Sequence, residues 1–221
     1  EIDVSVLENN TYSIDPTIFW AAGKLIALED SACPRVMLDT DLIVVKSISN
    51  ILSGSEITAL HSEPLNSEVY INPNYLKKPN GYKFPDFYDW SVLPSNTAFL
   101  YIKDNQFRDF YLDQSKSFMF NNFEKPMENV SQMVFAEQRL LSICAVIKEI
   151  DIQYMLESPF SLNNETIIHL WGFKNVLRKN NALEKLFMDK LINRFKKELK
   201  CLQDLALPCL QAYCQSPTSQ R

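Results

Sequence analysis

The sequence predicts an α/β protein, and three observations lead to this fold class. Residues 17–28 place apolar side chains at helical spacing, and residues 35–45 form an almost continuous apolar run, which is typical of a strand buried on both faces. A second apolar run at 97–102 is followed by another helical pattern at 105–119. Helices that alternate with buried strands indicate helices packed on a sheet.

Each element has its own signal. Asp15-Pro16 has the form of a helix start, with Asp as the N-cap and Pro at the first helical position. The helix expected at 17–28 is followed by a break at 31–34 and then by the strand 35–45. The remaining expected elements are short strands at 2–7, 56–61, 152–156 and 166–170, a loop with aromatic anchors at 62–91, a buried helix at 131–150 and a long amphipathic helix at 182–205.

The composition excludes several classes of function. The chain has 221 residues, and its 22 Lys and Arg against 27 Asp and Glu give a net charge of -5, which argues against nucleic-acid binding. Only four residues are Gly, and neither the GxGxxG fingerprint nor the Walker A phosphate loop is present. The five Cys include no CxxC pair and are odd in number, so we expect reduced thiols, with a pair between Cys209 and Cys214 as the alternative.

The domain organisation is expected to be simple. We expect one domain over residues 1–180 and an extension over 181–221 that consists of an amphipathic helix and a polar tail. The sequence contains no signal peptide and no run of about 18 apolar residues, so we expect a cytoplasmic protein. The lysines of the helix 182–205 either face solvent on a helix packed against its own domain or bind a partner or the cytoplasmic face of a membrane.

The triplet Asp39-Thr40-Asp41 is the most informative motif. In an extended chain, residues i and i+2 point to the same side, so the two carboxylates converge beside an apolar strand. Two like charges this close are unfavourable unless a cation offsets them. Oxygen ligands of this kind fit Mg²⁺ or Mn²⁺, especially when phosphates share the site. The alternative is a solvated turn between two strands.

A second group of polar residues lies near the end of the predicted domain. His169 follows a short strand and could complete a metal site with the two aspartates. Gly172 would allow the backbone to approach a ligand closely, and Lys174 would offer a point charge to a phosphate. The alternative is a hydrogen-bonded core histidine beside a turn.

Two weaker candidates lie between these motifs. Asn96 precedes the strand 97–102, where the usual role of an Asn is to form a turn or a cap. Glu137-Gln138 lies within the helix 131–150, where such a pair usually belongs to a solvated face.

Taken in order, these motifs resemble those of nucleotide-diphospho-sugar glycosyltransferases of the GT-A fold, nearest to the glycogenin-like and lipopolysaccharide galactosyl- and glucosyltransferase group. The shared pattern is a helix at 19–24, an apolar strand ending in Asp-x-Asp, an Asn-led strand, an acidic pair in a helix and a late HxxGxK at 169–174. The resemblance covers roughly residues 15–175.

The resemblance implies a GT-A type mixed sheet flanked by helices, with a C-terminal helical extension. It implies a metal-dependent hexosyltransferase of retaining type that moves a sugar from a nucleotide-diphosphate donor to a saccharide or other acceptor. Mn²⁺ or Mg²⁺ would be held by Asp39, Asp41 and His169. The donor would contact Asp39, Asp41, Asn96, Gly172 and Lys174, and the reacting sugar would lie near Glu137 and Gln138.

The departures from the family pattern define the alternatives. Thr97-Ala98 stands where the family has Ser-Gly, and no Pro-Trp follows Lys174, so a non-catalytic GT-A-like binding domain is one alternative. A phosphatase of haloacid-dehalogenase type, with Asp39 as nucleophile, is another. It is disfavoured because 38 residues precede Asp39 and no late Asp-Asp pair occurs.

Two further expectations concern the acceptor and the nucleotide-binding half of the domain. The acceptor is expected to contact the loop 62–91, where aromatic side chains either stack on a sugar or anchor the loop. GT-A domains usually have one or two βα units before the Asp-x-Asp strand. Because this chain begins at Glu1 rather than Met, we expect part of the nucleotide-binding half to be missing from it.

Overall fold

The computed structural model describes residues 13–126, 130–158, 166–170 and 173–215, with side chains as far as Lys200. The strand expected at 2–7 and the candidate Gly172 lie outside the described residues. Where it is described, the protein is a mixed α/β structure, as the sequence predicts.

The chain divides into two compact units. Unit 1 comprises Glu1–Asp39 and Ser49–Asn163, and unit 2 comprises Thr40–Ile48 and Asn164–Arg221. The boundary expected at residue 180 lies inside unit 2, because a strand near residue 43 pairs with a strand near residue 168.

Unit 1 contains a four-stranded mixed sheet. Its strands are β1 (Arg35–Leu38), β4 (Phe99–Ile102), β3 (Ile57–Ala59) and β5 (Ile152–Tyr154), in that spatial order. Strand β4 is antiparallel to both of its neighbours, whereas β3 and β5 are parallel. Every residue of β3 and β4 is buried, so these two central strands form the middle of the core.

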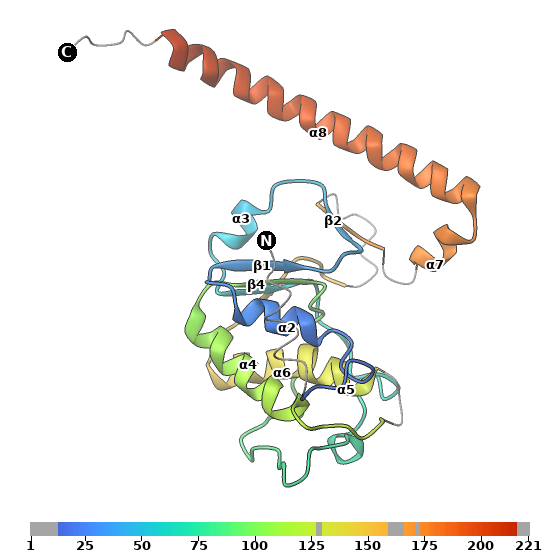
Figure 1. Ribbon diagram of the computed structural model, residues 1–221. Coiled ribbons are helices and arrows are strands. Elements are labelled where there is room, and N and C mark those ends of the chain that lie inside the picture. The colour runs from blue at the N-terminus through green and yellow to red at the C-terminus, as the bar shows by residue number, and fades with distance from the viewer. Residues whose placement is uncertain (1–12, 127–129, 159–165, 171–172, 216–221) are drawn as a thin grey trace, which may run out of the picture. The chain divides into compact units, whose positions relative to one another are not determined.

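Helices flank this sheet. Helix α2 (Ala22–Glu29), helix α4 (Asn105–Met119) and helix α6 (Leu140–Ile147) lie together on one side of β1 and β4 (Figure 1). Helix α6 continues a helical segment that starts with α5 (Ser131–Val134) and passes through a π-helical turn, η2 (Phe135–Arg139). The helix expected at 131–150 is therefore confirmed, although its second turn is π rather than α.

The helix starts show where local signals succeed and fail. Helix α4 begins as its spacing predicts, and the Asp104 carboxylate accepts hydrogen bonds from the backbone N–H groups of Gln106 and Phe107. The expected start of a helix at residue 17 is wrong. The Asp15 carboxylate accepts from Thr17 in a separate turn, and α2 begins five residues later.

The loop 62–91 carries a short 3-10 turn, η1 (Pro73–Tyr75), and several core side chains. A short helix, α3 (Ser49–Leu52), lies outside this loop and precedes β3. Tyr70 and Tyr88 are buried, and Phe84 packs edge-on or stacked against Trp90, Phe118 and Phe135. Most aromatic side chains of this loop therefore act as anchors.

Unit 2 contains a two-stranded antiparallel ribbon and two helices. Strand β2 (Leu42–Val44) pairs with β6 (Ile167–His169), which places Leu42 opposite His169. Helix α7 (Phe173–Arg178) follows and packs against α8 (Asn181–Gln215), which is longer than the helix expected at 182–205. Within the described residues, no helix combines the length and apolar character needed to span a membrane.

The apolar run 35–45 is not one strand, so this expectation is wrong. The chain turns at Thr40-Asp41, and the two halves of the run pair in different sheets. Neither half is buried on both faces, since the ends of β1 are exposed and β2 is only partly covered. A turn at this point places Asp39 at the end of unit 1 and Asp41 at the start of β2.

Candidate functional site

Asp39 lies at the end of β1 and is paired with a buried lysine. Its backbone N–H donates to the carbonyl of Ala98 at 2.8 Å, which extends the β1–β4 pairing by one residue. Its carboxylate accepts from Lys24 Nζ of α2 at 2.7 Å. The Lys24 side chain is 15% exposed and that of Asp39 is 38% exposed, so the ammonium group is largely shielded from solvent while the carboxylate is not.

Lys24 also pairs with Glu137, a predicted site residue. The distance from Lys24 Nζ to Glu137 Oε1 is 2.6 Å, and Nζ also donates to the Thr97 carbonyl at 2.7 Å. Glu137 is 4% exposed and accepts a hydrogen bond from Thr97 Oγ1 at 2.8 Å. We call Lys24, Asp39, Thr97 and Glu137 the Lys24 cluster. It joins four elements of unit 1 that lie far apart in the sequence.

The π-helical turn explains how a helix can hold Glu137 here. Its widened backbone turns two carbonyls toward hydroxyl groups on α4. Tyr111 donates to the carbonyl of Glu137 at 2.7 Å, and Ser115 donates to that of Ala136 at 2.7 Å. Such turns are common at functional sites. Glu137 is therefore fixed in the interior, and the alternative of a solvated helix face is wrong for this residue.

The electrostatics of the Lys24 cluster favour the charged form of Lys24. Burial alone would lower the pKa of Lys24, but the charges of Glu137 and Asp39 outweigh it and raise that pKa above 10.5. Burial, together with the charges of Glu63 and Glu137, raises the pKa of Tyr70, so this phenol stays protonated and can donate.

Asn96 and Gln138 belong to the same unit and are held by other side chains. Asn96 Nδ2 donates to Glu63 Oε1 at 2.9 Å, while Asn96 Oδ1 accepts from the Ala98 N–H at 3.0 Å. The second bond is the turn role expected for an Asn at a strand start, and the first fixes the amide orientation. Gln138 Oε1 accepts from the Tyr70 hydroxyl at 2.5 Å.

Unit 2 brings together three of the predicted residues. Asp41 Oδ1 lies 3.6 Å from His169 Nε2, and Asp41 Oδ2 accepts from Lys174 Nζ at 2.9 Å. The pairing of β2 with β6 sets the first contact, because Asp41 precedes Leu42 and its carbonyl accepts from the Leu170 N–H at 2.9 Å. We call Asp41, His169 and Lys174 the Asp41 cluster.

The Asp41 cluster is more open to solvent than the Lys24 cluster. The Asp41 side chain is 18% exposed and that of Lys174 is 47% exposed. Burial opposes ionisation of Asp41, but the hydrogen bond from Lys174 and the nearby His169 outweigh it and lower the pKa of Asp41 below 3.8. The carboxylate is therefore ionised at neutral pH, which a metal ligand requires.

Several of these side chains were missed from the sequence. Lys24 is the only charged residue between Pro16 and Leu28, and this isolation in an apolar helix was the signal that could have identified it. Glu63 and Tyr70 carried no comparable signal, since both lie in a loop with many polar and aromatic residues.

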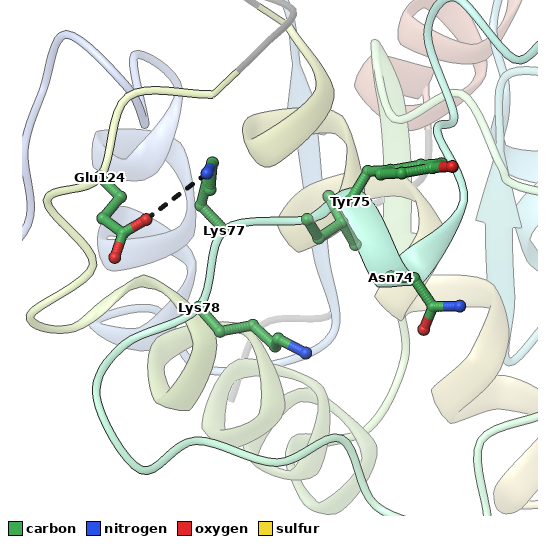
Figure 2. Close-up of a pocket in the computed structure, with 6 residues that line it drawn as sticks. Asn74, Tyr75, Lys77, Lys78 and Glu124 are labelled. Carbon is green, nitrogen blue, oxygen red and sulfur yellow. Dashed lines mark ion pairs between the residues drawn. The ribbon is translucent and has the colours of Figure 1, made fainter.

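An open cleft of about 330 Å³ lies elsewhere in unit 1, in the loop 62–91. It is lined by Asn74, Tyr75, Leu76, Lys77, Lys78 and Glu124. Figure 2 shows the Lys77 ammonium pointing toward Glu124, whose carboxylate lies 3.7 Å away. None of the predicted site residues lines this cleft, and Tyr75, which does, is 63% exposed.

Comparison with known proteins adds no assignment to this geometry. No protein-family model, curated protein or solved structure matches the chain.

Proposed function

We propose that the protein is a metal-dependent glycosyltransferase that uses a nucleotide-diphosphate sugar as donor, in a GT-A type fold. The observation that carries the proposal is the Asp41 cluster. One carboxylate has an imidazole nitrogen at one oxygen and an ammonium group at the other. These are the groups needed to hold a divalent cation and to neutralise a phosphate beside it.

The donor set fits a divalent ion. Two atoms bound to one ion through bonds of about 2.1 Å lie at most about 4.2 Å apart, and 3.6 Å between Asp41 Oδ1 and His169 Nε2 is within that limit. An imidazole ligand beside carboxylate oxygens favours Mn²⁺ over Mg²⁺, which prefers oxygen alone. The proposed ligands are Asp41, His169 and Asp39.

Asp39 is included in the proposed ligand set because it lies two positions before Asp41 in the chain. Only Thr40 separates it from Asp41, so the two Cα atoms lie within about 7 Å of each other. In unit 1 its carboxylate is already neutralised by Lys24. We therefore propose Asp41 and His169 as the principal ligands and Asp39 as the ligand that Lys24 must release.

The remaining residues take roles around the donor. A bound divalent ion would supply charge neutralisation for the departing nucleoside diphosphate. Lys174 is exposed enough to contact a phosphate oxygen directly. Asn96 would present an amide to the donor sugar in the orientation that Glu63 fixes, and Gln138 would lie near the reacting sugar.

Glu137 would act near the reacting sugar as a fixed negative charge. Its carboxylate is held by Lys24 and Thr97, so it does not need to reorient when charge develops on the sugar. This arrangement suits electrostatic stabilisation better than proton transfer, because Lys24 and Thr97 already hold Glu137 Oε1.

The test is calorimetric titration of the full chain with Mn²⁺ and a panel of nucleoside diphosphates. We expect diphosphate binding that requires Mn²⁺ and weakens at least 10-fold in Asp41→Asn and in His169→Gln. Asp113→Asn, an exposed aspartate of α4, is the matched control and should bind like the wild type. Absence of diphosphate binding in the presence of Mn²⁺ would rule out the transferase proposal.

Turnover then separates the proposal from its alternatives. A nucleotide-sugar panel should show donor hydrolysis or transfer that stops when the metal is chelated. Metal-dependent diphosphate binding without turnover of any nucleotide sugar would identify a non-catalytic binding domain. Phosphate release from simple phosphate esters, lost in Asp39→Asn, would instead identify a phosphatase.

A further inference from the structure

Helix α8 carries an apolar stripe made of Phe187, Met188, Leu191, Ile192, Phe195 and Leu199. At 100° per residue these six side chains fall within an arc of about 140° on one side of the helix. Three of them are widely exposed, with Met188 at 45%, Ile192 at 44% and Leu199 at 57%. Large apolar side chains exposed side by side mark an interaction surface.

The same helix is basic, although the chain is acidic. Residues 181–200 of α8 contain six Lys and Arg against three Asp and Glu, a net charge of +3, while the whole chain carries -5. The exposed lysines of α8 lie outside the arc of the apolar stripe, and Lys185 and Lys196 border one of its edges. The arc also contains Glu184 and Glu198, so α8 presents an apolar stripe that includes two carboxylates and has positive charge along one edge.

We infer that α8 binds an anionic membrane surface, lying in the interface with the apolar stripe toward the acyl chains. A helix of this type buries its stripe at the headgroup boundary while its lysines extend toward the phosphates. Figure 1 shows α8 as one long helix, and the 20 residues Asn181–Lys200 span about 30 Å. The inference does not rest on the proposed glycosyltransferase activity.

Charge selects the membrane over a second copy of the chain. Pairing two α8 stripes would bring the lysine edges of both helices together, and each carries a net positive charge. An anionic bilayer offers hydrocarbon to the stripe and negative headgroups to Lys185 and Lys196 along the whole contact. It also requires no shaped groove, which a protein partner would have to supply.

Vesicle co-sedimentation of the full chain tests this inference. The probe is a vesicle of phosphatidylcholine with about 30% phosphatidylserine, compared with phosphatidylcholine alone. We expect binding to the anionic vesicles that falls at least 10-fold on neutral ones and weakens with salt. Lys185→Gln/Lys196→Gln should lower the partition coefficient about 30-fold, because each lysine near the surface contributes about fivefold.

Two further variants complete the design. Lys83→Gln/Lys125→Gln removes the same charge from exposed positions of unit 1 and should bind like the wild type. Ile192→Ser/Leu199→Ser keeps all lysines but shortens the stripe, and we expect binding to fall at least 10-fold. Circular dichroism checks that each variant is folded.

Three results would overturn the inference. The first is unchanged binding in Ile192→Ser/Leu199→Ser, which would show that the stripe does not enter the bilayer. The second is equal loss in the unit 1 control, which would assign the binding to total charge. The third is no vesicle binding together with a dimer in sedimentation that Ile192→Ser/Leu199→Ser dissociates, which would assign the stripe to self-association.

Discussion

The Lys24 cluster and the Asp41 cluster use the same chemistry at different burial. In each, a lysine neutralises an aspartate that belongs to one Asp-x-Asp triplet. Lys24 is 15% exposed and meets a second carboxylate that is 4% exposed, whereas Lys174 is 47% exposed. Breaking a buried pair leaves an uncompensated charge, while an exposed pair contributes little. The comparison indicates that the Lys24 cluster stabilises the fold. In the Asp41 cluster, the Lys174 ammonium group can leave the Asp41 carboxylate at little cost in stability.

The largest expected effect is that of Lys24→Met. The variant leaves Asp39 and Glu137 without their shared cation, so we expect the free energy of unfolding to fall by about 3–5 kcal/mol. Urea denaturation measures the loss, and amide hydrogen exchange should place it in the helices of unit 1. Lys103→Met removes an exposed pair with Glu56 and should cost less than about 1 kcal/mol. Equal losses in the two variants would show that burial does not distinguish them.

A smaller loss is expected for Glu137→Gln. The amide oxygen can still accept from Thr97, and Lys24 keeps Asp39 as a partner, so we expect destabilisation of about 1–3 kcal/mol. A double-mutant cycle with Lys24→Met should give a coupling energy above about 0.5 kcal/mol. Additive effects would mean that the two side chains do not act as a pair.

We expect Lys174→Met to weaken ligand binding while leaving the stability of the fold almost unchanged. Because its pair with Asp41 is half exposed, the free energy of unfolding should change by less than about 1 kcal/mol. If the proposed function is right, Mn²⁺-dependent diphosphate affinity should nevertheless fall about 10-fold, since one charge-assisted contact contributes about 1.4 kcal/mol or more. A stability loss as large as that of Lys24→Met would contradict the contrast between the clusters.

The smallest effect is the acid dependence of Asp41. A carboxyl whose pKa is lowered by folding contributes stability that is present above its unfolded pKa, near 3.8, and is lost as pH falls through the folded value. The stability difference between the wild type and Asp41→Asn should therefore shrink from pH 5 to below pH 3. Urea midpoints at pH 5, 4 and 3 give the measurement, and a difference that grows toward low pH would refute the assignment.

Local patterns were sufficient for many elements of the fold. The spacing of Phe107, Phe110 and Tyr111 predicts the helix at 105–119 with its observed bounds, because a helix that packs on one side repeats its apolar residues every three to four positions. The apolar run at 97–102 predicts a strand in the same way, and the strand is observed at 99–102. Both signals are carried by neighbouring residues and need no knowledge of partners.

Where the local patterns failed, contacts between residues far apart in the chain decided the structure. The run 35–45 is apolar on both sides of the Asp-x-Asp triplet, so the sequence gives no sign that β1 and β2 pair in different sheets. The helix at 131–150 was expected, but the π turn that fixes Glu137 depends on hydroxyl groups from α4. Strand pairing and such contacts join residues that are far apart in the chain, and periodicity does not record them.

By itself, the sequence determined which chemical groups are present and which elements carry them: the Asp-x-Asp triplet, His169 and Lys174 near short strands, and an amphipathic basic helix. Only the tertiary structure decided how those groups pair. It placed Lys24 between Asp39 and Glu137, and it set Asp41 between His169 and Lys174. The physical reason is that the strength of an ion pair depends on distance and burial, and both are set by folding rather than by spacing in the chain.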